Sequence, residues 1–372
     1  MIYLDYAANT PVEPAVLARF CEVEQAFVGN PNSSHAAGRE ARAEMDRVTA
    51  SIASLLGAQP EEVICTSGAT EANNLAIKGL ARASRHQGRH IISTPLEHSS
   101  ASGSLTALQE QGWEIDLLDV RRDGTVDLEQ LGELLRKDTV LLAICAVDSE
   151  LGVIQQMEEI KALLKNFPHC RLHVDATQAM GKAPLSFEGI DTLSLSSHKF
   201  GGLNGSGLLL KRSGLVLEPQ MHGGASTTIY RSGTPALALA AATETALRLA
   251  LEHYAENRAA VEAMNRRLRD ALSAYPKVRI NSPESAVPHI LNLSVQGVKA
   301  ARFQQALSDA GVCVSVKSAC STDGTPSRAV FAVSRDRKNA MSSWRISLSH
   351  RAAEQELDGF LQAFDRCYRE LT

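Results

Sequence analysis

Short apolar runs alternate with helix-like segments between residues 60 and 210. The runs are four to seven residues long and rich in Val, Ile and Leu, which is typical of buried strands. They are VICT (63–66), HIIS (90–93), IDLL (115–118), VLLAICA (140–146), RLHV (171–174), TLSLS (192–196) and GLLL (207–210). The intervening VIQQMEEIKALLKNF carries its apolar residues at helical spacing. This alternation predicts an α/β fold with a mainly parallel seven-stranded sheet covered by helices on both faces.

The alternation of strand-like and helix-like segments stops after residue 216. Residues 217–235 are rich in Gly, Ser and Thr and contain two prolines, so we interpret them as a long loop. An Ala- and Leu-rich segment then predicts one helix over about 236–273. The rest of the chain predicts a second, smaller α/β unit with strands near VRIN, HILNLS, VCVSV and WRISL and a final helix, AEQELDGFLQAFDRCYREL.

Composition and charge narrow the possible functions. The chain has 372 residues and a net charge of −4, so no basic field favours nucleic acid or an anionic membrane. The opening MIYLDYAANTPVEP lacks the basic and apolar regions of a signal peptide, and no apolar run approaches the roughly 18 residues that span a bilayer. The seven cysteines are scattered and never spaced as CxxC, which is typical of a reducing cytosol. We therefore expect a cytoplasmic protein.

Two charged residues follow apolar strands directly. Lys199 comes after TLSLS and before the glycine-rich GGLNGSG. An isolated lysine in such a turn is more often a surface residue, whereas a buried lysine with a lowered pKa forms a Schiff base. Asp175 comes after RLHV, where a buried carboxylate needs a cation such as a protonated pyridine nitrogen. The simpler interpretation of Asp175 is a helix N-cap.

Two further strand ends carry candidate chemistry. In CTSGATEANNLAIKG (65–79), Gly68, Ala69 and Thr70 present small side chains and free N–H groups at a helix start. That pattern is typical of an anion site, and an ordinary helix cap is the alternative. It matches neither the GxxxxGK(S/T) motif of a nucleotide P-loop nor the GxGxxG motif of a dinucleotide site. His98, after the strand HIIS, is on its own more often structural. All four strand ends are expected to meet at one edge of the parallel sheet.

Together these features fit pyridoxal 5'-phosphate (PLP). A lysine holds the aldehyde, an aspartate keeps the ring nitrogen protonated, the small-residue cradle binds phosphate, and a histidine stacks on the ring or moves protons. A metal site is a weaker hypothesis. His169, Cys170 and His173 lie close in sequence, as do His86 and His90, but neither group has the ligand number of a zinc site, and we expect no metal.

The order of the motifs carries a resemblance over nearly the whole chain. It rests on the segments YLDYAANTPVEP, GNPNSSH, TSGATEANNLAIKG, LEHSS, HVDATQAMGK, SSHKFGG, HGG, RSGT, SACS and WRISL. In this order they resemble the cysteine desulfurases of the NifS/IscS type, in the class-V aminotransferase branch of the fold type I PLP enzymes. The resemblance implies a large PLP-binding domain over residues 15–250. It also implies a small domain, made of residues 1–14 and 251–372, that carries the catalytic-cysteine loop.

The same resemblance assigns cofactor-binding roles. Lys199 is implied as the Schiff-base lysine, Asp175 as the partner of the pyridine nitrogen, and Gln178 as the partner of the ring's phenolic oxygen. His98 is implied to stack on the ring and act as an acid and base. The implied phosphate ligands are the backbone of Ala69, the side chains of Thr70, Ser196 and His198, and Thr234 from the other subunit of a homodimer.

Substrate binding and catalysis are implied in the same way. Arg345 is expected to bind the substrate carboxylate through its planar guanidinium, with Asn30 and Ser149 nearby. Without the resemblance we would interpret Arg345 as a surface ion pair. Cys320, in KSACSTDGTPS, is implied as the nucleophile that removes sulfur from L-cysteine, leaving L-alanine and a persulfide. A loop of small polar residues suits a cysteine that moves between the cofactor and a sulfur acceptor.

Several positions depart from the family pattern. Asp148, Ser149 and Glu150 replace the usual Asn-Asn-Glu, and Ala225, Ser226 and Thr227 replace Gly-Gln-Glu. Ser349 and His350 replace the usual Gly-Arg, and Lys317 replaces a glycine. A serine at 149 is shorter than asparagine and lacks its amide, so we expect altered substrate binding and a divergent desulfurase. Lys317 either lowers the thiol pKa of Cys320 or is a solvated loop lysine.

The expected partners are L-cysteine, a second copy of the chain, and a sulfur-acceptor or scaffold protein for iron–sulfur cluster assembly or another thio-modification. Direct binding to nucleic acid or membranes is not expected. Two classes of alternative remain open at this stage. One is another enzyme of the same fold, either a cysteine or selenocysteine lyase or a class-V aminotransferase. The other is a catalytically weak sulfur-transfer partner protein.

Overall fold

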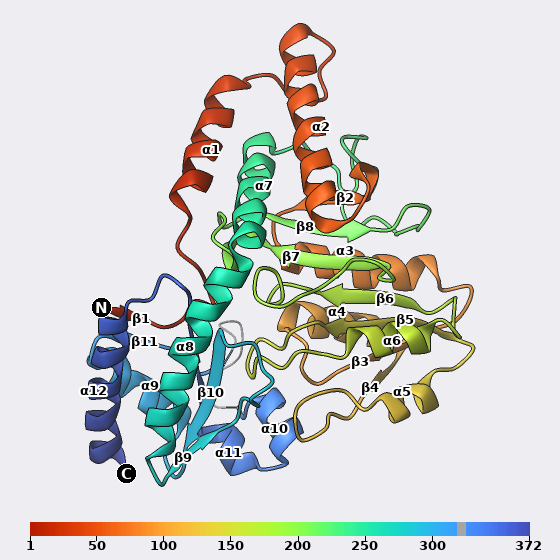
Figure 1. Ribbon diagram of the computed structural model, residues 1–372. Coiled ribbons are helices and arrows are strands. Elements are labelled where there is room, and N and C mark those ends of the chain that lie inside the picture. Colours follow the sequence, from red (N-terminus) through yellow and green to blue (C-terminus); the bar gives the residue numbers. More distant parts are fainter. Residues whose placement is uncertain (318–324) are drawn as a thin grey trace.

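A seven-stranded sheet forms the centre of the larger part of the molecule (Figure 1). The computed structural model describes residues 1–317 and 325–372. In spatial order the strands are β2 (Val63–Thr66), β8 (Gly207–Lys211), β7 (Thr192–Ser196), β6 (Arg171–Asp175), β5 (Thr139–Cys145), β3 (His90–Ser93) and β4 (Glu114–Leu117). Only β8 runs antiparallel to its two neighbours in this sheet. The seven predicted strands are confirmed, each within one residue at either end.

Helices cover both faces of this sheet, as predicted. Successive side chains in a strand point to opposite faces. Leu209 of β8 therefore joins one apolar core, while Leu208 and Leu210 join another. The first core packs against α3 (Ala69–Ala83) and α4 (Ser99–Gln109). The second packs against α1 (Pro14–Ala26), α2 (Ala36–Leu56), α6 (Met157–Leu164) and α7 (Leu237–Glu252).

Shorter elements complete this part of the chain. A helix, α5 (Leu128–Leu134), lies between β4 and β5 in sequence. Two 3₁₀ turns, η1 (Pro60–Glu62) and η2 (Ser197–Lys199), lie directly before β2 and directly after β7. The second turn has a functional consequence, because it places Lys199 at the carboxyl edge of the sheet.

The predicted helix over 236–273 is two helices rather than one. The first, α7, ends at Glu252, and α8 (Tyr254–Ser273) begins two residues later. The intervening His253 has φ −98° and ψ 11°, outside the helical values, although its N–H still bonds to the Leu249 carbonyl at 3.1 Å. The break redirects the chain from the large sheet toward the smaller unit (Figure 1).

The smaller unit contains a three-stranded antiparallel sheet in the order β12 (Ser343–Ser347), β10 (Ile290–Val295) and β9 (Val278–Ile280). The predicted strand VCVSV is shorter, β11 (Val312–Cys313), and pairs instead with the N-terminal β1 (Ile2–Tyr3). The remaining helices are α9 (Ala300–Asp309), α10 (Arg328–Ser334), α11 (Arg337–Ser342) and α12 (Glu354–Leu371). Both termini lie on this side of the molecule (Figure 1).

A separate apolar core supports this unit. It combines Leu4 and Tyr6 from the N-terminal segment with residues between Val261 and Cys367. Phe303 and Trp344 stack at its centre with ring centroids 5.4 Å apart. On this basis we propose the division given above, with residues 15–250 as the large domain and residues 1–14 and 251–372 as the small domain.

Candidate active site

The carboxyl ends of β3, β6 and β7 and the start of α3 open onto one cavity of about 330 Å³. Ligand sites in such sheets gather at this edge. Ten of the residues proposed from the sequence line the cavity: Ala69, Thr70, His98, Ser149, Asp175, Gln178, Ser196, His198, Lys199 and Arg345. Their sequence positions span more than 270 residues, so their convergence is a property of the fold.

Lys199 projects from η2 into this cavity. Its Nζ donates to the backbone carbonyls of Ala7 at 2.9 Å and Ala8 at 2.7 Å. The strand β7 ends at Ser196, and the following 3₁₀ turn brings the lysine to the sheet edge. The N-terminal segment therefore orients the lysine, which is a role that the sequence did not indicate.

Asp175, the last residue of β6, is buried and has no ion-pair partner among the described residues. Its Oδ2 accepts a hydrogen bond from Asn73 Nδ2 at 2.8 Å, and its Oδ1 accepts one from Thr177 N–H at 2.9 Å. Both donors are neutral. A buried carboxylate with only neutral donors is suited to a cationic group on its open side, such as a protonated pyridine nitrogen.

Asn73 holds this part of the site together, and the sequence analysis did not assign it. Its Nδ2 also donates to Ser100 Oγ at 2.8 Å, while its Oδ1 bonds to His173 Nε2 at 3.0 Å and to the Ser194 hydroxyl. The residue is fully buried in α3. An asparagine on the apolar face of a helix is a sequence signal that could have revealed it, because such a residue must be hydrogen-bonded.

His98 caps the N-terminus of α4. Its Nδ1 accepts from the Ser100 N–H at 3.2 Å and lies 2.9 Å from Ser100 Oγ. Because Nδ1 accepts from a backbone N–H, the neutral ring carries its proton on Nε2. Burial is the main cause that lowers the pKa of His98, and Lys199 adds to it while Asp175 opposes it. The ring is therefore neutral near pH 7 and able to exchange a proton at Nε2.

The start of α3 is the candidate anion cradle predicted from the sequence. Gly68 has φ 147°, and a Cβ built there would lie 3.3 Å from Ser196 Oγ. At Gly207 a Cβ would lie 2.6 Å from Gly68 Cα, so both glycines allow a close approach of β8 to the helix start. Ser196 Oγ and His198 Nδ1 are 2.9 Å apart at this position. These donors and free backbone N–H groups fit a phosphate.

Gln178 bonds to Lys182 and to the N-terminal segment through its amide. Its Nε2 donates to the Ala7 carbonyl at 2.9 Å, and its Oε1 accepts from Lys182 Nζ at 2.7 Å. The amide therefore presents its N–H groups toward the Ala7 carbonyl that also accepts from Lys199. An amide N–H is the group required to bond a phenolic oxygen.

Arg345 lies on β12 in the smaller unit and is 1% exposed. Its Nη1 donates to the Ser149 carbonyl at 2.7 Å and its Nη2 donates to Asp5 Oδ1 at 2.9 Å. The Nε is buried without a hydrogen-bond partner among the described residues. A guanidinium with an unused donor at a cavity wall is suited to a carboxylate. Asp5, another residue that the sequence analysis did not assign, balances its charge.

Two buried carboxyl groups near the cavity were also missed. Burial raises the pKa of Glu97 to about 8, although the Thr94 hydroxyl and the Cys145 N–H both donate to its Oε1. Burial, followed by the charge of Glu150, raises the pKa of Asp148 to about 7. Both carboxyl groups therefore keep a proton to a higher pH than an ordinary Asp or Glu, which limits the negative charge beside the site.

Two proposed residues, Asn30 and Thr234, do not line the cavity. Asn30 is exposed, and its Oδ1 accepts from Asn32 N–H at 2.9 Å. Thr234 is exposed at the end of the loop 217–235. That loop is linked to α3 by the ion pair of Arg231 with Glu71, at 2.9 Å. Cys320 lies outside the described residues.

The same described part of the chain carries neither a candidate metal centre nor a helix that could span a membrane. It holds no group of three or more His, Cys, Asp or Glu residues suited to a metal ion. None of its helices combines the length and apolar composition needed to cross a membrane.

Comparison with known proteins supports the resemblance. The sequence model of the family Aminotransferase class-V matches residues 2–360. A NifS/IcsS protein homolog of Lactobacillus delbrueckii subsp. bulgaricus is 35% identical over 378 residues, covering 100% of this chain and 98% of that protein. Cysteine desulfurase IscS of Proteus mirabilis is 37% identical over 366 residues, covering 96% and 90%. A solved NifS-like protein is 32% identical, with a TM-score of 0.93 and complete coverage of both chains. The resemblance is confirmed: the chain belongs to the NifS/IscS group of the class-V aminotransferase family.

Proposed function

We propose that this protein is a PLP-dependent cysteine desulfurase. The observation that carries the proposal is the convergence of ten residues on one cavity in a chain of this PLP-dependent family. The group supplies an electron-withdrawing ring that makes the Cα proton of a bound amino acid labile. Lys199 would hold its aldehyde carbon, Asp175 its ring nitrogen and Gln178 its phenolic oxygen. The start of α3, with Ser196 and His198, would hold its phosphate.

The chain's own residues account for the remaining chemistry. Arg345 binds the carboxylate of L-cysteine through its unused donors and orients the Cα–H bond. Lys199 and the Nε2 of His98 move protons at the substrate carbons. The Cys320 thiolate forms a new S–S bond to the substrate sulfur while the C–S bond breaks, and the carbon takes up a proton. One L-cysteine therefore gives one L-alanine and one persulfide sulfur on Cys320.

The proposal extends to partners. We infer that the enzyme acts in the cytoplasm as a homodimer in which Thr234 of each subunit reaches the phosphate of the other. Its exposure on the loop 217–235 supports this role. The persulfide is passed to a sulfur-acceptor or scaffold protein for iron–sulfur cluster assembly or another thio-modification.

The direct test is incubation of the purified holoprotein with L-cysteine. We expect one equivalent of L-alanine and one added sulfur atom on Cys320 by peptide mass spectrometry, and repeated sulfide release when a reductant is supplied. Cys320→Ser should abolish both while the protein keeps its cofactor absorbance. Cys21→Ser is the matched control, because Cys21 is an exposed free cysteine.

Other outcomes identify the alternatives. Sulfide release that survives Cys320→Ser would identify a lyase. Transfer of the amino group to a keto acid without sulfide release would identify an aminotransferase. A protein that binds the cofactor and converts no amino acid would identify a sulfur-transfer partner without desulfurase activity.

A further inference from the structure

A second cavity, of about 270 Å³, lies beside the candidate active site. The two cavities share only Ala7 and Lys199 among their lining residues. The second one is formed where the larger and smaller units meet. Its walls come from the N-terminal segment, the turn after β6, the α7–α8 break and the ends of β10 and β12. The proposed desulfurase reaction makes no use of it.

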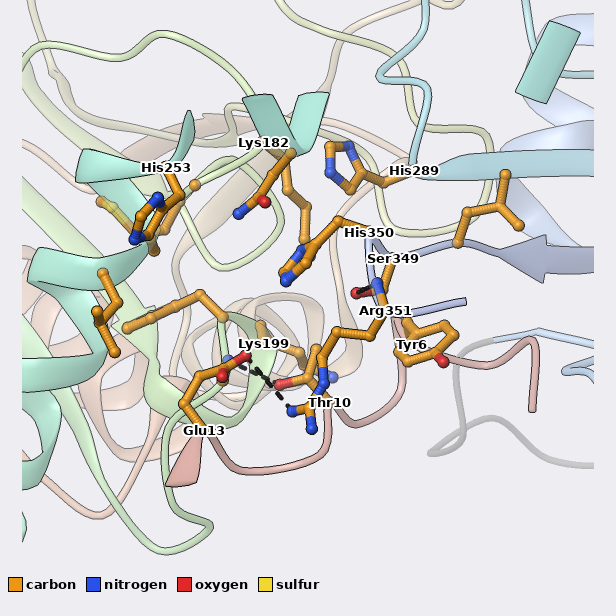
Figure 2. Close-up of a pocket in the computed structure, with 18 of the residues that line it drawn as sticks. Tyr6, Thr10, Glu13, Lys182, Lys199, His253, His289, Ser349, His350 and Arg351 are labelled. Atoms are coloured by element: carbon orange, nitrogen blue, oxygen red, sulfur yellow. Dashed lines mark hydrogen bonds and ion pairs between the residues drawn. The ribbon is translucent and has the colours of Figure 1, made fainter. Parts of the chain in front are cut away.

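Basic side chains from three separate segments gather on one side of this cavity. Figure 2 shows Lys182, His289 and His350 around the same space. Lys182 and His289 are each only 7% exposed, whereas His350 lies at the mouth. His350 is also one of the positions where the chain departs from the usual family sequence.

His289 is the most informative of the three. Its Nδ1 is buried without a hydrogen-bond partner among the described residues, and no described residue bonds its other ring nitrogen. A buried polar group left unbonded costs about 1 to 3 kcal/mol, so such groups are rare unless something else binds them. His289 therefore places an unsatisfied ring nitrogen in the wall of a cavity that is large enough to hold a partner for it.

The acidic residues of this cavity are already matched. Glu13 pairs with Arg351 at 3.4 Å, and Glu256 lies 3.9 Å from His253 Nδ1. The carboxylates of both pairs are more exposed than Lys182 and His289, which form the buried end of the cavity. Lys182 has a single neutral partner, the Oε1 of Gln178 at 2.7 Å. The buried end thus offers N–H donors without a carboxylate to balance them.

We propose that this cavity is a binding site for a compact oxyanion, either a carboxylate or a tetrahedral phosphate-like group, held by Lys182, His289 and His350. The donors are of the kind that form charge-assisted hydrogen bonds to oxyanions. The enclosed volume suits a small metabolite or the charged end of one, and it lies on the Lys199 side of the cofactor pocket.

Binding at this site is linked to protons. Burial, followed by nearby positive charge, lowers the pKa of Lys182 to about 7 and that of His289 well below its usual value. An anion favours the charged forms, so binding takes up protons and weakens as the pH rises. The ionisable and charged groups that face these two residues are Tyr6, Glu13, Lys199, His253, Glu256, Arg258, Arg345, His350 and Arg351.

The test is isothermal titration of the holoenzyme with sodium sulfate and, separately, with sodium acetate. Both anions stay fully ionised near neutral pH, so any proton exchange belongs to the protein. Titrations in two buffers with different ionisation heats should show saturable binding and an uptake of about one proton. The affinity should fall between about pH 6 and about pH 8. Binding of sulfate alone indicates phosphate-like ligands, and binding of acetate alone indicates carboxylates.

Variants decide where the anion binds. His289→Leu should weaken the proton-linked binding about tenfold or more, because one charge-assisted hydrogen bond is lost. His86→Gln, at an exposed histidine far from the cavity in sequence, should leave it unchanged. If His289→Leu fails to fold, His350→Gln at the cavity mouth takes its place, with a loss of about threefold. Absence of saturable binding by both anions, or binding unaltered in these variants, would overturn the proposal.

Discussion

Asn73 bonds to four buried polar groups at once, from Asp175, Ser100, His173 and Ser194. Three of these partners lie on the neighbouring strands β6 and β7 of the large sheet, and Ser100 lies in the first turn of α4. The side chain therefore fixes the position of Asp175 relative to the ring that caps α4. A network of this kind is costly to leave partly unsatisfied, because each orphaned group is buried.

Replacement of Asn73 by alanine should lower the free energy of unfolding by about 2 to 4 kcal/mol, since several buried groups lose their only partner. The variant should also release the cofactor faster. Denaturant unfolding and cofactor absorbance during dialysis measure the two effects. Asn74→Ala, at the next and partly exposed position of α3, is the control and should change stability by less than about 1 kcal/mol. Equal effects from the two variants would contradict the proposed role.

The raised pKa of Glu97 makes the free energy of unfolding depend on pH, and its stabilising contribution falls as the pH rises. The folded protein keeps a proton on this carboxyl up to about pH 8, whereas the unfolded chain loses it near pH 4.3. The stabilising contribution is therefore complete at low pH and is lost as the pH rises through that window. The Oε1 only accepts hydrogen bonds, from Thr94 and Cys145, so glutamine can replace the protonated acid without changing these contacts.

We expect Glu97→Gln to lose less stability than the wild type between about pH 5 and about pH 8. Denaturant unfolding at a series of pH values measures the difference in free energy of unfolding between the variant and the wild type. Because both proteins contain Asp148, its contribution cancels from this difference. Glu110→Gln removes an exposed carboxyl and should follow the wild-type curve. A Glu97→Gln curve that runs parallel to the wild type would show that Glu97 is ionised in the folded protein.

At the scale of elements, the start of α3 depends on one backbone conformation. Gly68 has φ 147°, which residues with a side chain rarely adopt, and it lies against Ser196 Oγ. The same residue precedes the N–H groups of the candidate anion cradle. Strain at this position would therefore move both the helix start and the cradle.

Gly68→Ala should reduce stability by about 1 to 3 kcal/mol and weaken cofactor binding. Gly103→Ala is the matched variant, because Gly103 lies within α4 with no atom within 4 Å of its added methyl group. That change should instead raise stability by about 0.5 to 1 kcal/mol through helix propensity and leave cofactor binding unchanged. Melting curves and a titration with the cofactor separate the two effects. An equally tolerated Gly68→Ala would contradict the geometric argument.

The break between α7 and α8 shows that contacts elsewhere in the fold can decide where a helix ends. The sequence around it, LALEHYAENRAA, contains good helix formers and neither Gly nor Pro, so local propensity predicts continuity. The break occurs where His253, Glu256 and Asn257 line the second cavity between the two units. We therefore attribute the end of α7 to packing between the two units, because the local sequence contains no signal that would end a helix.

At the scale of the whole molecule, the larger and smaller units both contribute residues to the site. Arg345 comes from a strand of the smaller unit, while Lys199 and Asp175 come from the large sheet. Movement of one unit against the other would change the distance between the carboxylate-binding group and the lysine. The position of Asp5, bonded to Arg345 at 2.9 Å, shows that the N-terminal segment belongs to this arrangement.

The proposed homodimer is a prediction about the assembled protein. We expect sedimentation of the holoenzyme to give the mass of two chains. Thr234→Val should keep the dimer and release the cofactor about threefold to tenfold faster, since one hydrogen bond to the phosphate is lost. A monomeric holoenzyme with full activity would contradict the dimer, and an unchanged release rate would remove Thr234 from the site.

Local sequence patterns alone determined much of this protein. The apolar runs predicted all seven strands of the large sheet, because a buried parallel strand needs little beyond a short run of branched apolar residues. Motif order predicted the family and ten residues of the cavity, because reactive groups follow strand ends at fixed positions. Asn30 and Thr234 lie outside that cavity, and the roles assigned to them and to Cys320 stay predictions.

Only the tertiary structure decided the rest. The bonds of Asn73 to Asp175 and His173 join residues about 100 positions apart, and those of Arg345 to Asp5 join residues 340 apart. No local pattern encodes such pairs. The raised pKa values of Glu97 and Asp148 and the meeting of Lys182, His289 and His350 have the same origin. Burial and long-range proximity set the chemistry of a side chain, and both exist only once the chain has folded.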